Sequence, residues 1–277
     1  MPGRRIVTAL VLLALLLPAI FVAEPRAWAA LTLIFLVAGA WEWGRLLAGR
    51  RAAAILAAAM ALIGLVLFVR LPAPGWPPLL LDLIGALATV LWLGLGSWRL
   101  HTRNARAGGP AAGLLLAGVW LLACWLALVE LHAIGPVPLL VAMAIVWVAD
   151  TAAYFTGRRF GRHKLAPAIS PGKTREGAIG AIVITALAGW VVALVPAWPA
   201  TLPARLLDVW GLPACLSVLM ALVVLSIIGD LHESLLKRQA GVKDSGVLLP
   251  GHGGVLDRID ALVPVMPAVM LLHRLLG

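Results

Sequence analysis

Residues 211–229 read GLPACLSVLMALVVLSIIG, and the residues that follow, 230–238, read DLHESLLKR. The first stretch has nineteen residues and no charge, close to the roughly 20 residues that a helix needs to cross a 30 Å hydrocarbon core. The second stretch is rich in acid and base. This abrupt change predicts a membrane-spanning helix that continues into a charged segment at one membrane surface.

The composition of the whole chain predicts an integral membrane protein. Of its 277 residues, 62% are hydrophobic and 12% charged, and the mean hydropathy is +1.03. A soluble domain is about 45–50% apolar and about 25% charged. Because backbone groups cannot stay unpaired in lipid, we expect an all-α, polytopic fold with about nine transmembrane helices. The predicted spans are 6–23, 28–48, 52–70, 79–98, 111–131, 137–157, 178–198, 211–229 and 259–276.

The first apolar run and the two cysteines have simple interpretations. Arg4 and Arg5 precede the first run, as in a cleaved secretory signal, but the run is longer than the roughly 7–15 apolar residues of a signal. We therefore expect an uncleaved first helix. Cys124 and Cys215 lie inside apolar runs without metal-binding spacing, so we expect them to be small core residues.

The positions of the basic residues predict the orientation of the chain in the membrane. If the N-terminus is cytoplasmic, 18 of the 22 lysines and arginines fall on the cytoplasmic side, as the positive-inside rule requires. The net charge of +10 then reflects topology and attraction to anionic lipid, and we expect no nucleic-acid partner. The predicted location is the cell (inner) membrane, with the N-terminus and the active-site loops cytoplasmic.

Charge also divides the chain into N-terminal transmembrane helices, residues 1–136, and a C-terminal catalytic region, residues 137–277. Two segments of the second region, 150–176 and 230–260, hold seven of the twelve acids and all four lysines. Arginine outnumbers lysine by 18 to 4 and satisfies an orientation bias equally well. The retained lysines therefore indicate a need for compact point charges, as at phosphate, with chance clustering as the alternative.

The first of these segments carries Asp150, Tyr154 and Gly157 at i, i+4 and i+7, on one face of a helix. A carboxylate at the edge of the membrane is costly unless it is paired or functional. We interpret Asp150 as a substrate-binding residue; a structural ion pair with an arginine of the following loop is the alternative.

The loop that follows has hydroxyl and basic side chains directly before the next span. Ser170, Lys173 and Arg175 lie there, where free backbone N–H groups at a helix start favour phosphate. The run Gly172-Lys173-Thr174 is similar to the end of a Walker A loop, but Pro167 stands where that motif requires glycine. The segment is therefore interpreted as a phosphate-binding surface without a P-loop.

The second segment places acids at the ends of two helices. Asp230, Glu233, Ser234 and Lys237 share a face at i, i+3, i+4 and i+7, while Asp257 and Asp260 lie one turn apart before the last span. Carboxylates from two helix ends can hold Mg²⁺, which takes one or two of them together with substrate phosphates and water. Solvated helix ends are the alternative, most of all for Glu233 and Asp260.

His252 lies in the run Gly251-His252-Gly253-Gly254. Glycines there allow positive φ and a close approach of the backbone to a ligand. We interpret His252 as a substrate-binding residue, and a structural turn histidine is the alternative.

The order of residues in both segments is that of a known family. The second reads Ser234-x-x-Lys237-Arg238, four residues, Lys243-Asp244, and then Pro250-x-His252-Gly253-Gly254-x-x-Asp257-Arg258-x-Asp260. This order resembles the diagnostic motif of phosphatidate cytidylyltransferases, also called CDP-diacylglycerol synthases. The first segment resembles the family's Asp-x-x-Ala-Tyr-x-x-Gly and Ser-Pro-x-Lys-Thr-x-Glu-Gly stretches. Gly172 departs from the basic or polar residue that the family often has at that place.

The resemblance implies transfer of CMP from CTP to phosphatidic acid, which gives CDP-diacylglycerol and pyrophosphate. It also implies a homodimer and a Mg²⁺ requirement, with a second cation possible. The metal ligands would be Asp230, Asp257 and Asp260. The catalytic residues would be Asp230, Asp257, Lys243, Asp244 and Arg258. The substrate-binding residues would be Asp150, Ser170, Lys173, Arg175, Ser234, Lys237, Arg238 and His252.

Two other functions are compatible with the same sequence. A cytidylyltransferase could act on another lipid phosphate, such as an ether or isoprenoid phosphate, because nothing in the apolar spans specifies acyl chains. A transporter is the second alternative, since intramembrane carboxylates can serve as coupling sites. Transporters carry ionisable residues near span midpoints or show internal repeats. Here the acids gather at the predicted cytoplasmic ends of the spans, which favours an enzyme.

Overall fold

The computed structural model describes residues 14–70, 76–249, 251 and 253–277, and these are mostly helical. Residues 14–22 are helical and are followed by α2 (Pro25–Ala48), α3 (Arg50–Arg70), α4 (Pro78–Leu91), the π-helical segment η1 (Trp92–Gly96), α5 (Ser97–His101), α6 (Gly109–Ile134), α7 (Pro136–Phe160), α8 (Arg175–Ala193), α9 (Leu202–Gln239), α10 (Leu256–Ile259) and α11 (Leu262–Leu275). The exception to the all-α prediction is an antiparallel hairpin of β1 (Lys164–Ala166) and β2 (Ser170–Thr174).

Seven of the described helices are long and apolar enough to cross a membrane: α2, α3, the run Pro78–His101, α6, α7, α8 and α9. They match seven of the predicted spans, so a polytopic membrane fold is confirmed. The predicted span 6–23 lies largely outside the described residues. The last predicted span, 259–276, corresponds to α11, which has 14 residues and is short for a 30 Å core at 1.5 Å per residue.

Helices α2 and α3 form a tight hairpin joined by Gly49 alone. Gly49 has φ +86°, a conformation that residues with a side chain rarely adopt. Within the hairpin, a Cβ at Gly44 would lie 2.7 Å from Ala53 Cα, so the two backbones approach closely only because residue 44 is glycine. These glycines explain how two spans fit around a one-residue turn.

Helix α9 has 38 residues and breaks at Gly211, whose φ is 76° and ψ 175°. Pro213, which has no backbone N–H to donate, follows the break. The predicted span 211–229 thus begins at the break, and the helix continues past it to Gln239. The same straight segment carries both the apolar span and the charged side chains of residues 230–238.

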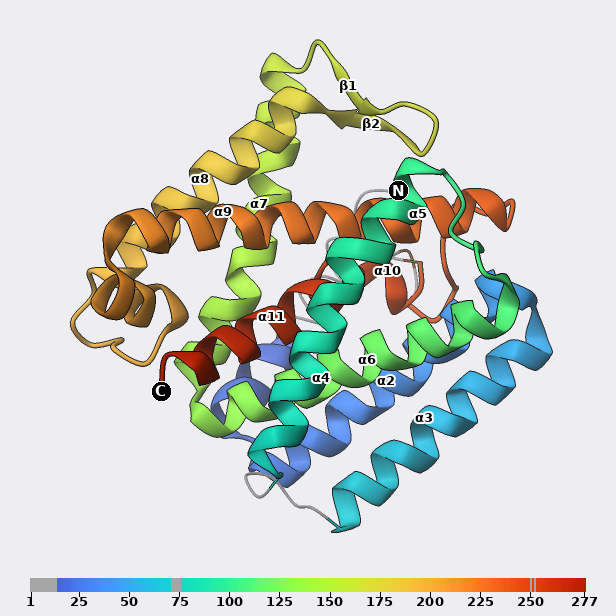
Figure 1. Cartoon of the computed structure of the whole chain (residues 1–277), viewed down its shortest axis with the longest axis horizontal. Helices are drawn as coiled ribbons and strands as arrows, with labels where there is room; N and C mark the ends of the chain where they lie inside the picture. Colours follow the sequence, from blue (N-terminus) through green and yellow to red (C-terminus); the bar gives the residue numbers. More distant parts are fainter. Residues whose placement is uncertain (1–13, 71–75, 250, 252) are drawn as a thin grey trace.

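The helices form two groups, with α9 crossing between them (Figure 1). One group contains α2, α3, α4 and α6, and the other contains α7 and α8 with the β hairpin above them. Helix α11 contacts α4, α6, α7 and α9, and all its residues from Leu262 to Met270 are buried. This central position explains why residues 262–270 of α11 are apolar on every side of the helix.

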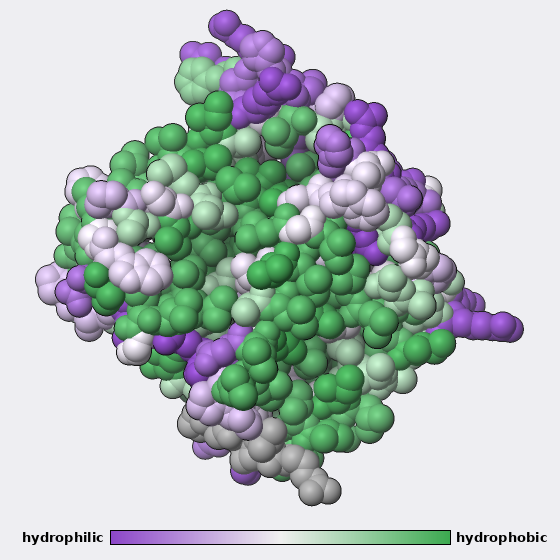
Figure 2. All heavy atoms as spheres, in the orientation of Figure 1, coloured by the Kyte–Doolittle hydropathy of each residue, from purple (hydrophilic) through white to green (hydrophobic). Residues whose placement is uncertain are grey.

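The surface separates into an apolar band and polar ends. Figure 2 shows hydrophobic residues over most of the visible face and hydrophilic residues along the upper and right margins, where Figure 1 places the hairpin, α5 and the turn between α2 and α3. Further hydrophilic residues lie toward the opposite, lower-left margin. Exposed apolar side chains such as Leu62, Leu83 and Leu115 fit contact with lipid rather than water.

Candidate active site

The β hairpin is fixed to the start of α8 by the residues of the Ser-Pro-x-Lys-Thr-x-Glu-Gly stretch. Thr174 caps α8, since its hydroxyl accepts a hydrogen bond from Gly177 N at 3.1 Å. Glu176 accepts hydrogen bonds from the backbone N–H groups of Arg162 and His163 at 3.1 and 3.2 Å. A Cβ at Gly177 would lie 2.9 Å from Ala153 O. These residues therefore hold the hairpin in place, and Lys173 projects from it.

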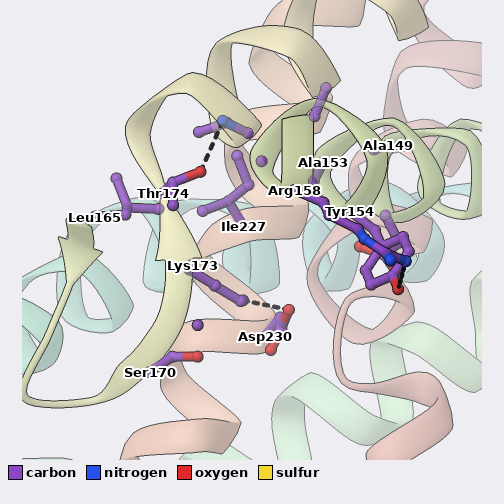
Figure 3. Close-up of a pocket in the computed structure, with 16 residues that line it drawn as sticks. Ala149, Ala153, Tyr154, Arg158, Leu165, Ser170, Lys173, Thr174, Ile227 and Asp230 are labelled. Atoms are coloured by element: carbon purple, nitrogen blue, oxygen red, sulfur yellow. Dashed lines mark hydrogen bonds and ion pairs between the residues drawn. The ribbon is translucent and has the colours of Figure 1, made fainter. Parts of the chain in front are cut away.

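A cavity of about 460 Å³ opens between the hairpin, α7, α8 and α9. Four predicted site residues line it: Asp150, Ser170, Lys173 and Asp230. Lys173 reaches from β2 to form an ion pair with Asp230 of α9, and Ser170 extends from the same strand toward that pair (Figure 3). The structure thus brings together residues from both predicted segments, 150–176 and 230–260.

The α7 wall of the cavity confirms the predicted shared helix face. Asp150, Tyr154 and Gly157 all line the cavity. The Tyr154 hydroxyl accepts a hydrogen bond from Arg158 Nη1 at 3.2 Å (Figure 3). Arg158 also lines the cavity and was not predicted as a site residue. Its signal in the sequence was its position one turn after Tyr154.

Three carboxylates share the neighbourhood of Lys173. Asp230 is its ion-pair partner, and Asp150 and Asp260 lie close enough to interact electrostatically with both Asp230 and Lys173. Negative charge therefore exceeds positive charge at this position. Such an excess of carboxylate oxygen suits a hard divalent cation.

Further charges gather around Lys237, two turns after Asp230 on α9. The Lys237 ammonium forms ion pairs with Glu233 and with Asp257, the latter at 2.7 Å to Oδ1. Glu233 is only 2% exposed. The i, i+4 pair of Glu233 and Lys237 fits the predicted polar face of this helix, but both side chains are turned inward. The alternative left open by the sequence, that Glu233 is a solvated charge, is therefore wrong.

Asp257 is the most heavily hydrogen-bonded acid of the site. Its Oδ2 accepts from Ser245 N and Ser245 Oγ, both at 2.9 Å, and from Gly254 N at 2.7 Å. Burial favours the neutral form of the Asp257 carboxyl, but the hydrogen bonds from Lys237, Gly254 and Ser245 outweigh burial and lower its pKa to about 2. Asp257 is therefore a fixed carboxylate throughout the physiological pH range.

The predicted metal ligands are held by different partners. The described residues contain no group of three or more His, Cys, Asp or Glu side chains arranged to hold a metal ion. Asp230 is paired with Lys173, whereas Asp257 is paired with Lys237. Asp230, Asp150 and Asp260 offer the oxygen donors that Mg²⁺ uses together with substrate phosphates, so the donor chemistry fits. The assignment of metal ligands stays a prediction.

Most of the remaining predicted site residues lie near the charges around Lys173 and Lys237. Ser234 Oγ donates to Asp230 Oδ1 at 3.5 Å, and Arg238 Nε donates to Ile169 O at 3.3 Å, which ties α9 to the hairpin. His252 lies outside the described residues. Exposed positions are occupied by Arg175, Lys243, Asp244 and Arg258.

Sequence reasoning missed Glu42, which contacts the loop before α10. Glu42 lies on α2 and is 1% exposed, and its carboxylate accepts hydrogen bonds from Ser245 Oγ and Leu256 N. The signal was present, because a lone acid inside an apolar span is expected to be functional. Assigning residues 1–136 to membrane anchoring concealed it.

Comparison with known proteins identifies the family. Residues 3–276 match the cytidylyltransferase family. A phosphatidate cytidylyltransferase of Pseudomonas aeruginosa is 41% identical over 277 residues, which cover 95% of this chain and 94% of the relative. A phosphatidate cytidylyltransferase of Brucella suis is 45% identical over 181 residues, which cover 65% of this chain and 63% of the relative. One of Haemophilus influenzae is 47% identical over 129 residues, which cover 47% of this chain and 43% of the relative. The chain therefore belongs to the cytidylyltransferase family.

Proposed function

We propose that this protein transfers CMP from CTP to phosphatidic acid and releases pyrophosphate. The observation that carries the proposal is the cavity in which Lys173 and Asp230 meet beside Asp150 and Ser170. It lies where the apolar part of α9 gives way to charged residues. A water-soluble nucleotide and a lipid head group can both reach such a position. The Pseudomonas aeruginosa relative, which matches over nearly its full length, is named a phosphatidate cytidylyltransferase.

The reaction requires management of charge more than proton transfer. An oxygen of the lipid phosphate attacks the α-phosphorus of CTP, and the bond from that phosphorus to the bridging oxygen of pyrophosphate breaks. The attacking phosphate is already anionic at neutral pH, so no strong general base is needed. Lys173 and Lys237 each lie against carboxylates. We expect both to turn toward phosphate oxygens when the substrates bind, and to stabilise the charge that develops on the leaving group.

Asp230, Asp257 and Asp260 are the proposed ligands of Mg²⁺. When bound, the ion would supply positive charge that stabilises the pyrophosphate as it leaves. Asp230 lines the cavity, and Asp260 lies close enough to interact electrostatically with Asp230 and Asp150. Asp257 holds Lys237 and the backbone of the loop before α10. Asp257 therefore becomes available as a ligand only when Lys237 turns from it to a substrate.

We further propose nine spans, a cytoplasmic N-terminus, an active site at the cytoplasmic surface of the inner membrane, and a homodimer. Sidedness has a direct test, because both native cysteines are buried and give little background labelling. Single cysteines at Arg103 and Lys164 should react with a membrane-impermeant thiol reagent only from the cytoplasmic side. A cysteine at Ala200, in the exposed turn between α8 and α9, should react only from outside. Reaction of all three from one side would contradict this topology.

The activity is tested with purified protein, Mg²⁺, CTP and phosphatidate. We expect CDP-lipid and pyrophosphate in equal amounts. Parallel reactions with ATP in place of CTP, and with an isoprenoid phosphate in place of phosphatidate, define the base and the acceptor. A correctly folded preparation that releases no pyrophosphate from CTP and phosphatidate would overturn the proposal. Turnover with the isoprenoid phosphate alone would favour the alternative acceptor.

A further inference from the structure

Glu42 connects the N-terminal helices to the loop that carries Asp257. It is buried in α2, with 1% of its surface exposed. Its Oε2 accepts hydrogen bonds from Ser245 Oγ at 2.9 Å and from Leu256 N at 2.8 Å, and its Oε1 accepts one from Val255 N at 3.2 Å. One carboxylate therefore binds both ends of the segment 245–256, more than 200 residues away in sequence.

The loop fits around this carboxylate because two of its residues have no side chain. A Cβ at Gly246 would lie 2.1 Å from Glu42 Oε1, and a Cβ at Gly254 would lie 2.3 Å from Glu42 Oε2. Arg45, one turn further along α2, donates from Nη2 to Ser245 O at 2.7 Å. Helix α2 thus contacts the loop through an acid and a base in succession, and this close fit distinguishes the contact from ordinary helix packing.

Ser245 links Glu42 to Asp257. Its hydroxyl oxygen lies 2.9 Å from both Glu42 Oε2 and Asp257 Oδ2, and it accepts from Asp257 N at 3.3 Å. A hydroxyl has one hydrogen to donate, so the two carboxylates share one donor. The backbone N–H of Ser245 also donates to Asp257. A shift of residue 245 would therefore change the position of Asp257, and with it that of Lys237.

We propose that Glu42 is a positioning residue for the transfer reaction: it fixes the loop 245–256 so that Asp257 holds Lys237 in the site. The link to catalysis rests on the function proposed above for Lys237. The link to loop geometry depends only on the contacts of Glu42. Among the described residues, the hydrogen-bond partners of Glu42 are Ser245, Val255 and Leu256, and none of the three lines the cavity between the hairpin and α9, so its effect is indirect.

The first test compares Glu42→Gln with Glu24→Gln, a change of the same kind at the exposed position directly before the same helix. Glutamine keeps the size of Glu42 but replaces one accepting oxygen with an NH₂ group that faces N–H or O–H donors. We expect kcat to fall about 10–100-fold, as for other residues that orient a ligand-bearing group, with little change in KM for CTP or phosphatidate. Glu24→Gln should match the wild type. A kcat of Glu42→Gln near the wild-type value would overturn the proposal.

Double variants separate positioning from general weakening of the fold. The effects of two substitutions within one hydrogen-bond network do not add in free energy, whereas the effects of substitutions at distant sites do. Glu42→Gln combined with Ser245→Ala should lose hardly more activity than the worse single variant. Glu42→Gln combined with Lys173→Gln, on the opposite wall, should multiply the two losses. Multiplied losses in both pairs would show that Glu42 acts through overall stability, and would contradict the proposal.

Amide hydrogen exchange tests the positioning without any assay of turnover. In Glu42→Gln, exchange at residues 245–257 should become faster, and exchange in the hairpin 164–174 should stay as in the wild type. Unchanged exchange at 245–257 would refute the role of Glu42. If the variant and the wild type differ in exchange as expected but the wild type transfers no CMP, the proposed function is refuted. The inference that Glu42 positions the loop then still stands. If Glu42→Gln does not fold, Ser245→Ala provides the same comparison with a smaller change.

Discussion

Two clusters of ion pairs lie at the two ends of the helices, and they are built differently. At one end, Lys173 and Lys237 face an excess of carboxylates beside a cavity. At the other end, Arg274 of α11 binds Asp82 of α4 through two nitrogens and lies 3.6 Å from Glu130 of α6. The first cluster joins loops and a helix end around open space, whereas the second joins three helices directly.

The difference shows which charges are available to a ligand. The Arg274 guanidinium is a rigid fork, and its bonds to Asp82 and to Pro78 O occupy it. Each lysine of the first cluster is a single rotatable ammonium that can exchange a carboxylate for a phosphate. The chain has twelve acids, so the presence of charge alone does not mark the site. The geometry of the basic partner of each acid distinguishes a reactive site from a structural ion pair.

The largest effect is expected at the centre of the first cluster. Asp257→Asn keeps the size of the side chain but removes the charge that holds Lys237 and the backbone N–H groups of Ser245 and Gly254. We expect turnover to fall on the order of 10²–10³-fold, while the protein stays folded in detergent. The measurement is pyrophosphate release beside thermal unfolding. Asp208→Asn, at an exposed position near the start of α9, is the control, and equal losses in both variants would contradict the comparison.

A smaller loss is expected when the hairpin loses its cation. Lys173→Gln removes the partner of Asp230 and one positive charge from the cavity. Both side chains are partly exposed, so stability should change little, whereas turnover should fall about 10²-fold. Lys164→Gln, at an exposed position on the same hairpin, is the matched control. Equal turnover in the two variants would show that charge on the hairpin, and not the Asp230 pair, matters.

The second cluster should respond in the opposite manner. Arg274→Gln breaks its contacts to Asp82 and Glu130, and because Asp82 is 45% exposed the pair is worth about 1 kcal/mol or less. We expect Tm to fall by a few degrees and turnover at 25 °C to stay near the wild-type value. Loss of turnover with an unchanged Tm would mean that this end of the molecule also takes part in the reaction.

The smallest effect concerns pH. The pKa of Asp257 is lowered to about 2 from an ordinary value of 3.8, so its stabilising contribution is complete above pH 3.8 and is lost as the pH falls toward 2. The difference in Tm between wild type and Asp257→Asn should therefore be constant from pH 8 to pH 5 and shrink below pH 4. A difference that already shrinks between pH 8 and pH 6 would contradict a low pKa in the folded protein.

The membrane fold was largely predictable from the sequence, because apolar runs of sufficient length specify helices whatever their neighbours are. Most of the charged and hydroxyl side chains that line the cavity were also predicted, because they belong to the motifs on α7, β2 and α9. The hairpin β1–β2 was not predicted, since strands of three and five residues without apolar alternation give no periodic signal. The sequence left open whether Glu233 is solvated, because a helix face does not reveal whether another element covers it.

Contacts between distant segments account for what the sequence could not specify. Glu42 and Ser245 are 203 positions apart, and neither residue suggests the other. The division into anchoring residues 1–136 and catalytic residues 137–277 remains useful for locating the chemistry. It hides the fact that α2 supplies the acceptor around which the loop before α10 is folded. The contact between Glu42 and this loop depends on the packing of α2 against α10, which is a property of the tertiary structure.

The unbroken run of α9 from Gly211 to Gln239 has a mechanical consequence. Asp230 and Lys237 lie on the same helix as the apolar span, so the depth of these side chains in the membrane depends on the position and tilt of that helix. Helices adapt to bilayers of different thickness by tilting. We therefore expect a thinner or thicker membrane to strain the contacts that join α9 to the hairpin, so that the thickness of the bilayer influences the site.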